Sequence, residues 1–309
     1  MAEVIVIGGA NVDIKGRAQS LVLPGTSNPG HVTIAPGGVG RNVAENLARL
    51  DVDVALVSIV GDDANGQLVR TVTAKCGVDV SMIGTGSAPT GTYVAILDGS
   101  GEMVTAINDM RVIDGLNPGY LAQHEGRLAT ADLLVTDCNL PVDSLAWLAS
   151  LSARARRRLL IDPISVPKSQ KLLDLRLEAP VFALVANRLQ IESLTGHSEL
   201  EVAAKQLHMV GFENIVIHLG REGVMVSEGS GPPAKLPALP VEGIADVTGA
   251  GDAAVAGLVL GLLMGLTFLD AARLGQAAAA LNLQSLNSVA EDVSRDKLFW
   301  LAALAQDQK

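Results

Sequence analysis

Residues 246–258, with the sequence DVTGAGDAAVAGL, combine a glycine turn, a carboxylate and an apolar run. If a helix begins at Gly249, the backbone N–H groups of Gly249, Ala250 and Gly251 have no acceptor within it and lie at the positive end of its dipole. Glycine lets a phosphate approach such N–H groups closely. Asp252 would then lie in the first helical turn, where it can take a proton from an attacking hydroxyl while the N–H groups stabilise the transferred phosphoryl group.

A simpler interpretation is that GAG is only a tight strand-to-helix turn and that Asp252 favours the helix N-terminus. Short glycine motifs recur by chance, so this turn alone does not decide between the two interpretations. The rest of the chain has to supply the elements that position such a site.

A second glycine turn occurs early in the chain, in PGGVGRNVAENLARL. The apolar residues that follow recur at helical spacing, which predicts a helix after the turn. The residues concerned are Gly37, Gly38, Gly40, Val43, Leu47 and Leu50. Asn42 lies at the start of this helix, where it would either cap the helix or bind a ligand.

Polar residues also follow the first expected strand, residues 4–7. Open α/β sheets bind ligands beyond the carboxyl ends of their strands, and Asn11 and Asp13 lie there. An Asn and an Asp two residues apart can bind neighbouring hydroxyls of a polyol, and the alternative is a turn held by Asx hydrogen bonds. The GxGxxG fingerprint of dinucleotide binding is missing.

Composition limits the classes of function. The chain has 309 residues, 49% of them apolar and only 3% aromatic, which is typical of aliphatic helices on a parallel sheet. A net charge of −10 argues against nucleic-acid and anionic-membrane partners. Two cysteines without metal-ligand spacing indicate a reducing compartment. No signal peptide is apparent and the uncharged run 253–269 is short for a membrane span, so we expect a cytoplasmic protein.

Strands and helices alternate through the second half of the chain. Strands at 133–136, 159–162, 181–186 and 214–219 are each followed by a helix or a turn, which predicts a parallel sheet covered on both faces. We expect a single domain over residues 1–309.

A hairpin of residues 92–97 and 103–107, with a strand near 32–35, would form a small separate sheet that covers the ligand. The insertions near 14–36 and 90–110 would make up this lid. An exposed lid edge often pairs with a second copy, so we expect a homodimer through the lid.

The two glycine turns, about 200 residues apart and each opening a helix, resemble the two signatures of the ribokinase-like (PfkB-type) carbohydrate kinase family over essentially the whole chain. The resemblance implies a three-layer α/β/α fold with a mostly parallel central sheet and a small β-sheet lid. It also implies ATP and Mg²⁺ as cofactors, Asp252 as catalytic base and the 249–251 turn as anion site.

The resemblance assigns further residues to ligands. The residues implied for the sugar are Asn11, Asp13, Gly37, Gly38 and Asn42. Those implied for the nucleotide are Asn187, Gly220, Gly223, Thr248, Gln276, Ala279 and Asn282. Some relatives bind a monovalent cation such as K⁺ near the residue that matches Asp246.

One position departs from the family pattern. The family usually has N-x-x-E after the strand that ends at Ala186, and this chain has Asn187 followed by Gln190. Asn187 would help to organise phosphate and Mg²⁺, and Gln190 would reach the metal through water. Glutamine lacks the charge that holds magnesium-bound water. Glu192, two residues further on, points about 200° away from Gln190 around the helix axis. We therefore expect a weakened or altered magnesium dependence.

Within the family, several stretches on the substrate side are most similar to the pseudouridine kinases: GGANVDIKG, TSNPG, AINDM, TDCNLP and DPISVPKSQK. This similarity implies a nucleoside substrate and transfer of the γ-phosphoryl group of ATP to the 5′-hydroxyl of pseudouridine. It adds as substrate residues Ser27, Asn28, Asn108, Asp109, Met110, Asn139 and Lys168. For Lys168 the alternative is a solvent-exposed lysine at a helix start.

Two other functions stay open. The acceptor would be ribose, adenosine, inosine or a hexose phosphate. A phosphate would need basic residues near the lid, and we consider His31 and Arg111 too few for this, which favours a neutral substrate. Alternatively the chain is a binding protein that has lost catalysis. The intact GAGD turn argues against this, because a binder needs no base beside an anion site.

Overall fold

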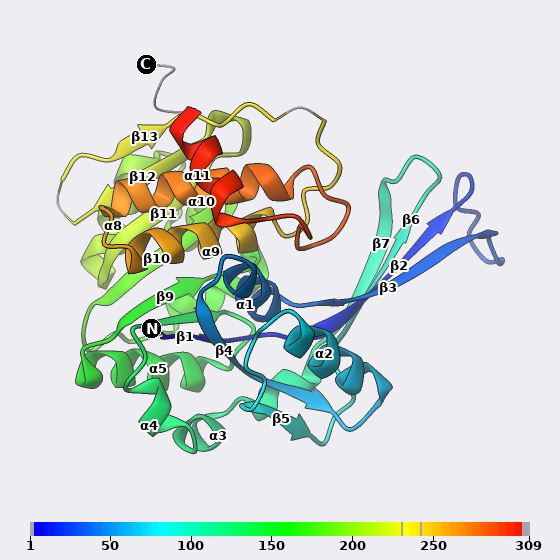
Figure 1. The fold of residues 1–309 in the computed structure, drawn as a ribbon, viewed down its shortest axis with the longest axis horizontal. Helices are drawn as coiled ribbons and strands as arrows, with labels where there is room; N and C mark the ends of the chain where they lie inside the picture. Colours follow the sequence, from blue (N-terminus) through cyan, green and yellow to red (C-terminus); the bar gives the residue numbers. More distant parts are fainter. Residues whose placement is uncertain (1–2, 230, 242, 305–309) are drawn as a thin grey trace.

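The central sheet has nine strands among the residues that the computed structural model describes, 3–229, 231–241 and 243–304. Their order is β13 (Ala234–Leu236), β12 (Val224–Glu228), β11 (Phe212–His218), β10 (Val181–Asn187), β9 (Arg158–Asp162), β8 (Leu133–Asp137), β1 (Glu3–Ile7), β4 (Asp53–Gly61) and β5 (Ile83–Gly86) (Figure 1). Pairing is parallel from β11 to β5, and β12 and β13 are antiparallel. The expected mostly parallel sheet is confirmed.

Helices cover both faces of this sheet (Figure 1). One face packs against α1 (Val39–Arg49), α2 (Ala64–Lys75), α9 (Ala250–Leu263), α10 (Phe268–Asn282) and α11 (Arg295–Leu304). The other packs against α3 (Pro118–Ala122), α4 (Glu125–Leu128), α5 (Val142–Ala155), α7 (Arg188–Thr195) and α8 (Leu200–Val210), with α6 (Val166–Ser169) beside α7.

The strand pattern explains the two cores. Successive strand residues point to opposite faces, so Val4 and Val6 of β1 belong to one core and Ile5 and Ile7 to the other. The resulting three-layer arrangement confirms the expected fold class. None of the described helices has the length and apolar character needed to cross a membrane.

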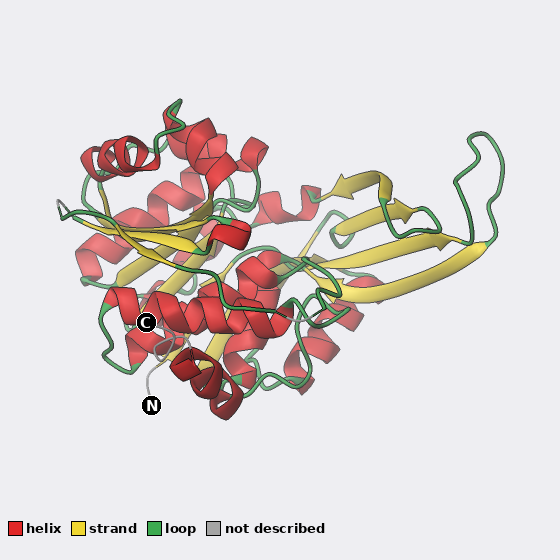
Figure 2. Ribbon diagram, turned by 90° about the horizontal axis from the view of Figure 1, so that it is seen from above, coloured by secondary structure: helices red, strands yellow, loops and turns green. Residues whose placement is uncertain are grey.

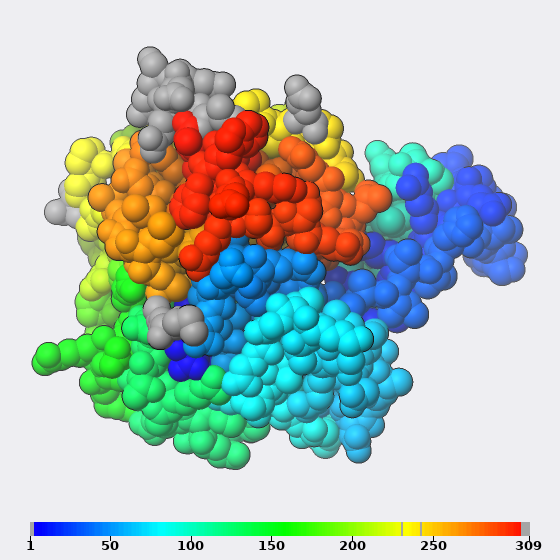
Figure 3. Space-filling model, in the orientation of Figure 1, coloured from blue at the N-terminus to red at the C-terminus, as the bar shows by residue number. Residues whose placement is uncertain are grey.

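A second sheet extends from one side of the body as the lid (Figures 2 and 3). Its order is β3 (Gly30–Gly37), β2 (Asn11–Ala18), β6 (Thr92–Leu97) and β7 (Met103–Asp109). The sequence analysis did not predict strand β2, because its first residues were interpreted as polar residues beyond the end of β1. Its sequence NVDIKGRA does alternate, but with only two large apolar residues.

Helices α9 and α10 pack at very short range through small residues. A Cβ atom on Gly257 would lie 2.5 Å from the carbonyl oxygen of Leu274, and one on Gly275 would lie 2.7 Å from the carbonyl oxygen of Ala254. Real Cβ atoms do not approach backbone so closely, so glycine is required for this packing. The contact fixes α9, and with it the first turn of α9, against the body.

Candidate active site

The two glycine turns meet at the carboxyl end of the central sheet. Helix α9 starts at Ala250, Gly249 precedes it in the left-handed conformation with φ 80°, and Asp252 lies in its first turn, as predicted. The Asn42 side chain donates a hydrogen bond from Nδ2 to Oδ2 of Asp252 at 2.8 Å. Asn42 lies inside α1, whose N-cap is Gly38, so the alternative that Asn42 caps this helix is wrong.

The 249–251 turn offers backbone donors. In the part of the chain that the structure describes, the N–H groups of Gly249 and Gly251 have no hydrogen-bond acceptor, whereas that of Ala250 donates to Val247 at 3.4 Å. A Cβ on Gly249 would lie 1.8 Å from the carbonyl oxygen of Ser288, so the fold requires this glycine. A Cβ on Gly251 would meet nothing within 4 Å. The approach to Gly251 is therefore open to an anion.

Burial controls the charge of Asp252. The residue is 8% exposed, and burial, followed by repulsion from Asp162, raises the pKa of its carboxyl to about 8, against the hydrogen bond from Asn42. Asp137 and Asp13 add smaller repulsions. Burial also raises the pKa of Asp162 to about 7. The site thus gathers several acids, and Asp252 keeps a proton near neutral pH.

Asp137 organises the early glycine turn. Its Oδ2 accepts hydrogen bonds from the N–H groups of Gly9 at 2.8 Å and Gly40 at 2.9 Å, and its Oδ1 accepts one from Asn139 at 2.9 Å. A Cβ on Gly40 would lie 2.7 Å from Cα of Gly8, so the end of β1 and the start of α1 touch directly. The sequence analysis gave Asp137 no role.

Several predicted substrate residues lie at the base of the lid. Asn11 donates to Oδ1 of Asp13 at 2.6 Å, and Gly37 packs against Asp13, because a Cβ there would lie 2.3 Å from its Oδ2. Strand register puts Asp13, Tyr93 and Asn108 in one row across the sheet and hence on one face. The sequence analysis did not single out Tyr93.

Met110, Asn139 and Lys168 belong to the same region. Met110 packs beside Gly9 and Gly91, and Asn139 also contacts Gly9. The ammonium group of Lys168 donates to Oδ1 of Asn139, and burial lowers the pKa of Lys168. The structure therefore favours a partly buried position beside Asn139 over a solvent-exposed lysine.

Three predicted substrate residues lie elsewhere. Ser27 and Asn28 are in the loop between β2 and β3 at the outer tip of the lid, about 24 Å along β2 from Asn11 at roughly 3.4 Å per residue. The side chain of Asn28 instead closes its own loop by hydrogen bonds to Leu23. Asp109 lies on the lid face opposite Asn108 and pairs with Arg111 at 2.6 Å.

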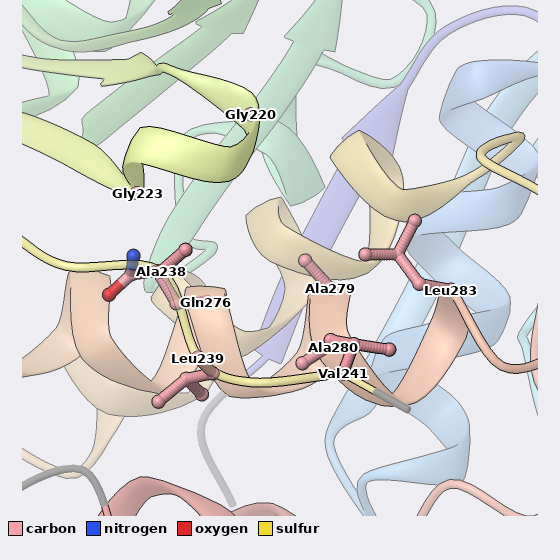
Figure 4. A pocket seen from close by; sticks show the side chains of 9 residues that line it. All are labelled: Gly220, Gly223, Ala238, Leu239, Val241, Gln276, Ala279, Ala280 and Leu283. Carbon is pink, nitrogen blue, oxygen red and sulfur yellow. The ribbon is translucent and has the colours of Figure 1, made fainter. Parts of the chain in front are cut away.

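A pocket on α10 matches the predicted nucleotide region (Figure 4). It is lined by Gly220, Gly223, Ala238, Leu239, Val241, Gln276, Ala279, Ala280 and Leu283. Asn282 is not among them. Its side chain donates to the carbonyl oxygen of Thr248 at 3.0 Å and accepts from the N–H of Ala290 at 3.0 Å, so it supports the 249–251 turn from behind.

Asn187 and Gln190 form a capping box at the start of α7. The Asn187 side chain accepts from the N–H of Gln190 at 3.0 Å, and the Gln190 side chain accepts from the N–H of Asn187 at 2.8 Å. Both side-chain oxygens therefore bind backbone, and the NH₂ groups are left for a ligand. Glutamine at this position serves the helix as well as glutamate would.

Asp246 is engaged on both oxygens. Its Oδ1 accepts from the N–H of Thr248 at 2.9 Å and from the Thr248 hydroxyl at 2.8 Å, and its Oδ2 pairs with Lys15 of β2 at 3.1 Å. This ion pair connects the lid to the segment that leads into α9. Among the described residues, no group of three or more His, Cys, Asp or Glu side chains is arranged to hold a metal ion.

We predict that, without added ligands, Asp252→Asn stabilises the protein more at high pH than at low pH. An acid whose pKa is raised on folding keeps its proton when the unfolded chain has lost it, so the wild type loses stability from about pH 4 to about pH 8. Asparagine still accepts from Asn42 but does not titrate. The gain in unfolding free energy should grow by about 1.4 kcal/mol per pH unit in this range. Urea unfolding at pH 5, 7 and 9 measures it, and a gain independent of pH would contradict the assignment.

Comparisons with known proteins agree with this geometry. The chain is 36% identical over 288 residues to pseudouridine kinase of Escherichia coli, covering 91% of this chain and 90% of that protein. A carbohydrate kinase from Agrobacterium tumefaciens is 30% identical and superposes with a TM-score of 0.86, with 98% of each chain covered. Arabidopsis thaliana ribokinase, complexed with ribose and ATP, has the same fold with a TM-score of 0.85 at 23% identity, covering 98% of this chain and 99% of that one.

The ribokinase-like fold is thereby confirmed. The model of the pfkB family of carbohydrate kinases matches residues 1–293. The chain therefore belongs to the pfkB carbohydrate kinase family.

Proposed function

We propose that this protein transfers the γ-phosphoryl group of ATP to the 5′-hydroxyl of pseudouridine in the cytoplasm. The observation that carries the proposal is the buried Asp252 carboxylate, held by Asn42 in the first turn of α9 beside the open N–H group of Gly251. The identity to pseudouridine kinase of E. coli supports the choice of nucleoside.

In this proposal the ionised form of Asp252, which its pKa of about 8 makes the minor form at pH 7, accepts the proton of the acceptor hydroxyl. The N–H groups at the start of α9 bind the transferred phosphoryl group. Asn11 and Asp13 bind the ribose hydroxyls, and Lys168 with Asn139 meets the base. ATP fits the chain, because the α10 pocket has an apolar lining with glycines at 220 and 223. Gly220 lies two residues after His218, which pairs with Asn187 at the end of β10. Lid closure would exclude water from the reacting groups.

Mg²⁺ fits the site through ATP phosphates and water. The oxygens of Asn187 and Gln190 already accept from backbone, so their NH₂ groups would orient phosphate or metal-bound water without ligating the metal. When bound, Mg²⁺ neutralises the charge of the phosphates. A monovalent cation such as K⁺ fits poorly, because both oxygens of Asp246 are engaged and Lys15 already supplies a positive charge there.

The decisive experiment compares ATP consumption with pseudouridine, uridine, ribose and adenosine. We expect pseudouridine to react fastest and Asp252→Asn to lower its turnover about 100- to 10,000-fold, the usual effect of a general base, with nucleoside binding retained. Retained turnover in this variant would remove the role of Asp252. A faster reaction with another acceptor would reassign the substrate, and binding without ATP consumption by any acceptor would indicate a silent binding protein.

The departure at position 190 has its own test. We expect Gln190→Glu to preserve the capping box, because glutamate is a standard residue there, and to add a charge toward metal-bound water. The Mg²⁺ concentration for half-maximal activity should fall severalfold while thermal stability stays unchanged. The control is Glu192→Gln, which removes a charge two residues further along α7. An unchanged Mg²⁺ requirement in Gln190→Glu would show that position 190 does not act on the metal.

We also propose that a second copy covers the apolar face of the lid. Register places Ile34, Ile14, Val94 and Ile107 in one row across this sheet, and Ile34 and Ile107 are 60% and 70% exposed. Such a row on a projecting sheet is typical of an interface. We expect light scattering to give a dimer mass for the wild type and a monomer mass for Ile34→Lys/Ile107→Lys. A monomeric wild type at micromolar concentration would contradict this.

A further inference from the structure

Arg41 is a buried cation to which the proposed reaction assigns no task. It lies in the first turns of α1 and is only 4% exposed. Burial lowers its pKa to about 10, so the guanidinium stays positive at neutral pH. A buried charge needs partners, and the partners of Arg41 lead to the site.

The guanidinium is fixed on several sides. Its Nη1 donates to the carbonyl oxygen of Pro36 at 2.9 Å and to Oδ1 of Asn42 at 2.8 Å, and its Nη2 pairs with Glu45 one helical turn away. Glu45 is itself 4% exposed and also accepts from Arg49 at 2.8 Å. Arg41 therefore has little freedom to move.

The contact with Asn42 determines which way its amide points. With Oδ1 of Asn42 bound to Arg41, its Nδ2 is left to donate to Asp252 at 2.8 Å. The two ends of an amide are not equivalent, since one accepts and the other donates. In the flipped orientation, NH₂ would face the guanidinium and oxygen would face the Asp252 carboxylate, and both contacts would be unfavourable. Only one orientation satisfies all three residues.

We propose that Arg41 is a positioning residue for phosphoryl transfer, which through Asn42 orients Asp252 and favours its ionised form. The proposal rests on the function proposed above. The groups that face Asp252 otherwise oppose its ionisation, because Asp13 of β2, Asp137 of β8 and Asp162 of β9 all repel it. The hydrogen bond from Asn42 is the contribution that lowers the pKa of Asp252. Arg41 holds that amide, and the charge of Asp252 in turn raises the pKa of Arg41, although less than Cys76 and Asp13 do.

Arg49 provides a matched control. It is a second arginine that pairs with Glu45 on α1, but it donates on its other side to the carbonyl oxygen of Glu291. Within the described part of the chain its hydrogen bonds do not include one to Asn42. A purely structural role for the buried cluster predicts similar effects from both arginines. A positioning role predicts that only Arg41 changes the titration of Asp252.

The test compares Arg41→Met, Arg41→Lys and Arg49→Met by the pH dependence of turnover at saturating ATP and pseudouridine. We expect Arg41→Met to move the acid limb of the profile upward by about one pH unit. Its turnover should then be about tenfold lower than that of the wild type at neutral pH and should approach the wild-type value at pH 9 to 9.5. Arg41→Lys should lie between Arg41→Met and wild type, because it keeps the charge without both hydrogen bonds. Arg49→Met should leave the limb in place. An unmoved limb in Arg41→Met, or equal shifts in both arginine variants, would overturn the proposal.

A second measurement does not depend on activity. Unfolding free energies are compared between pH 6 and pH 9 for Arg41→Met and Arg41→Lys, each in the wild-type and the Asp252→Asn background. Loss of Arg41 should steepen the fall of stability with pH only where Asp252 is present, because an acid of raised pKa destabilises the folded state as pH rises. The same slope in both backgrounds would refute the link between Arg41 and Asp252. If no acceptor is phosphorylated but the slopes differ, the proposed reaction fails and the link stands.

Discussion

The hydrogen bond between Asn42 and Asp252 joins parts of the chain that are 210 residues apart. It links the first turn region of α1 to the first turn of α9, so two helix N-termini converge on one edge of the central sheet. Helix N-termini carry partial positive charge, and this edge also collects the carboxylates that follow the parallel strands. The site therefore combines carboxylates with backbone N–H donors. The remaining contacts fix the positions of the two helix ends relative to each other.

Several of the groups that hold this site in place have no need to contact a ligand. Asp137 holds the N–H groups of Gly9 and Gly40, and Asn282 holds the carbonyl oxygen of Thr248. Each is almost completely buried and satisfies backbone atoms near a glycine turn. Because turns rich in glycine lack side chains of their own, their shape depends on such outside partners.

The sequence alone predicts the sheet, its two helical layers and the two glycine turns, because these follow from local periodicity and from residue types at strand ends. It does not reveal which polar groups are already occupied by the protein. Asn282 and Asp246 have the chemistry of ligand-binding residues, but each has one partner far away along the chain, at separations of 34 and 231 residues. The prediction of Ser27 and Asn28 as substrate residues disagrees with their position for a related reason. They are close to the site in sequence, but sequence distance does not show how far the length of a strand places a loop from the site.

Packing between α9 and α10 has a consequence for how this protein can vary in evolution. Because Gly257 and Gly275 let two backbones touch, almost any larger side chain there must push α9 away from its neighbour and displace the 249–251 turn at its start. Residues that offer no side chain to a ligand are thus under the same selection as the residues of the proposed site. Natural variants at this helix crossing are expected to be as rare as variants of the reacting groups, although nothing in their own chemistry would explain it.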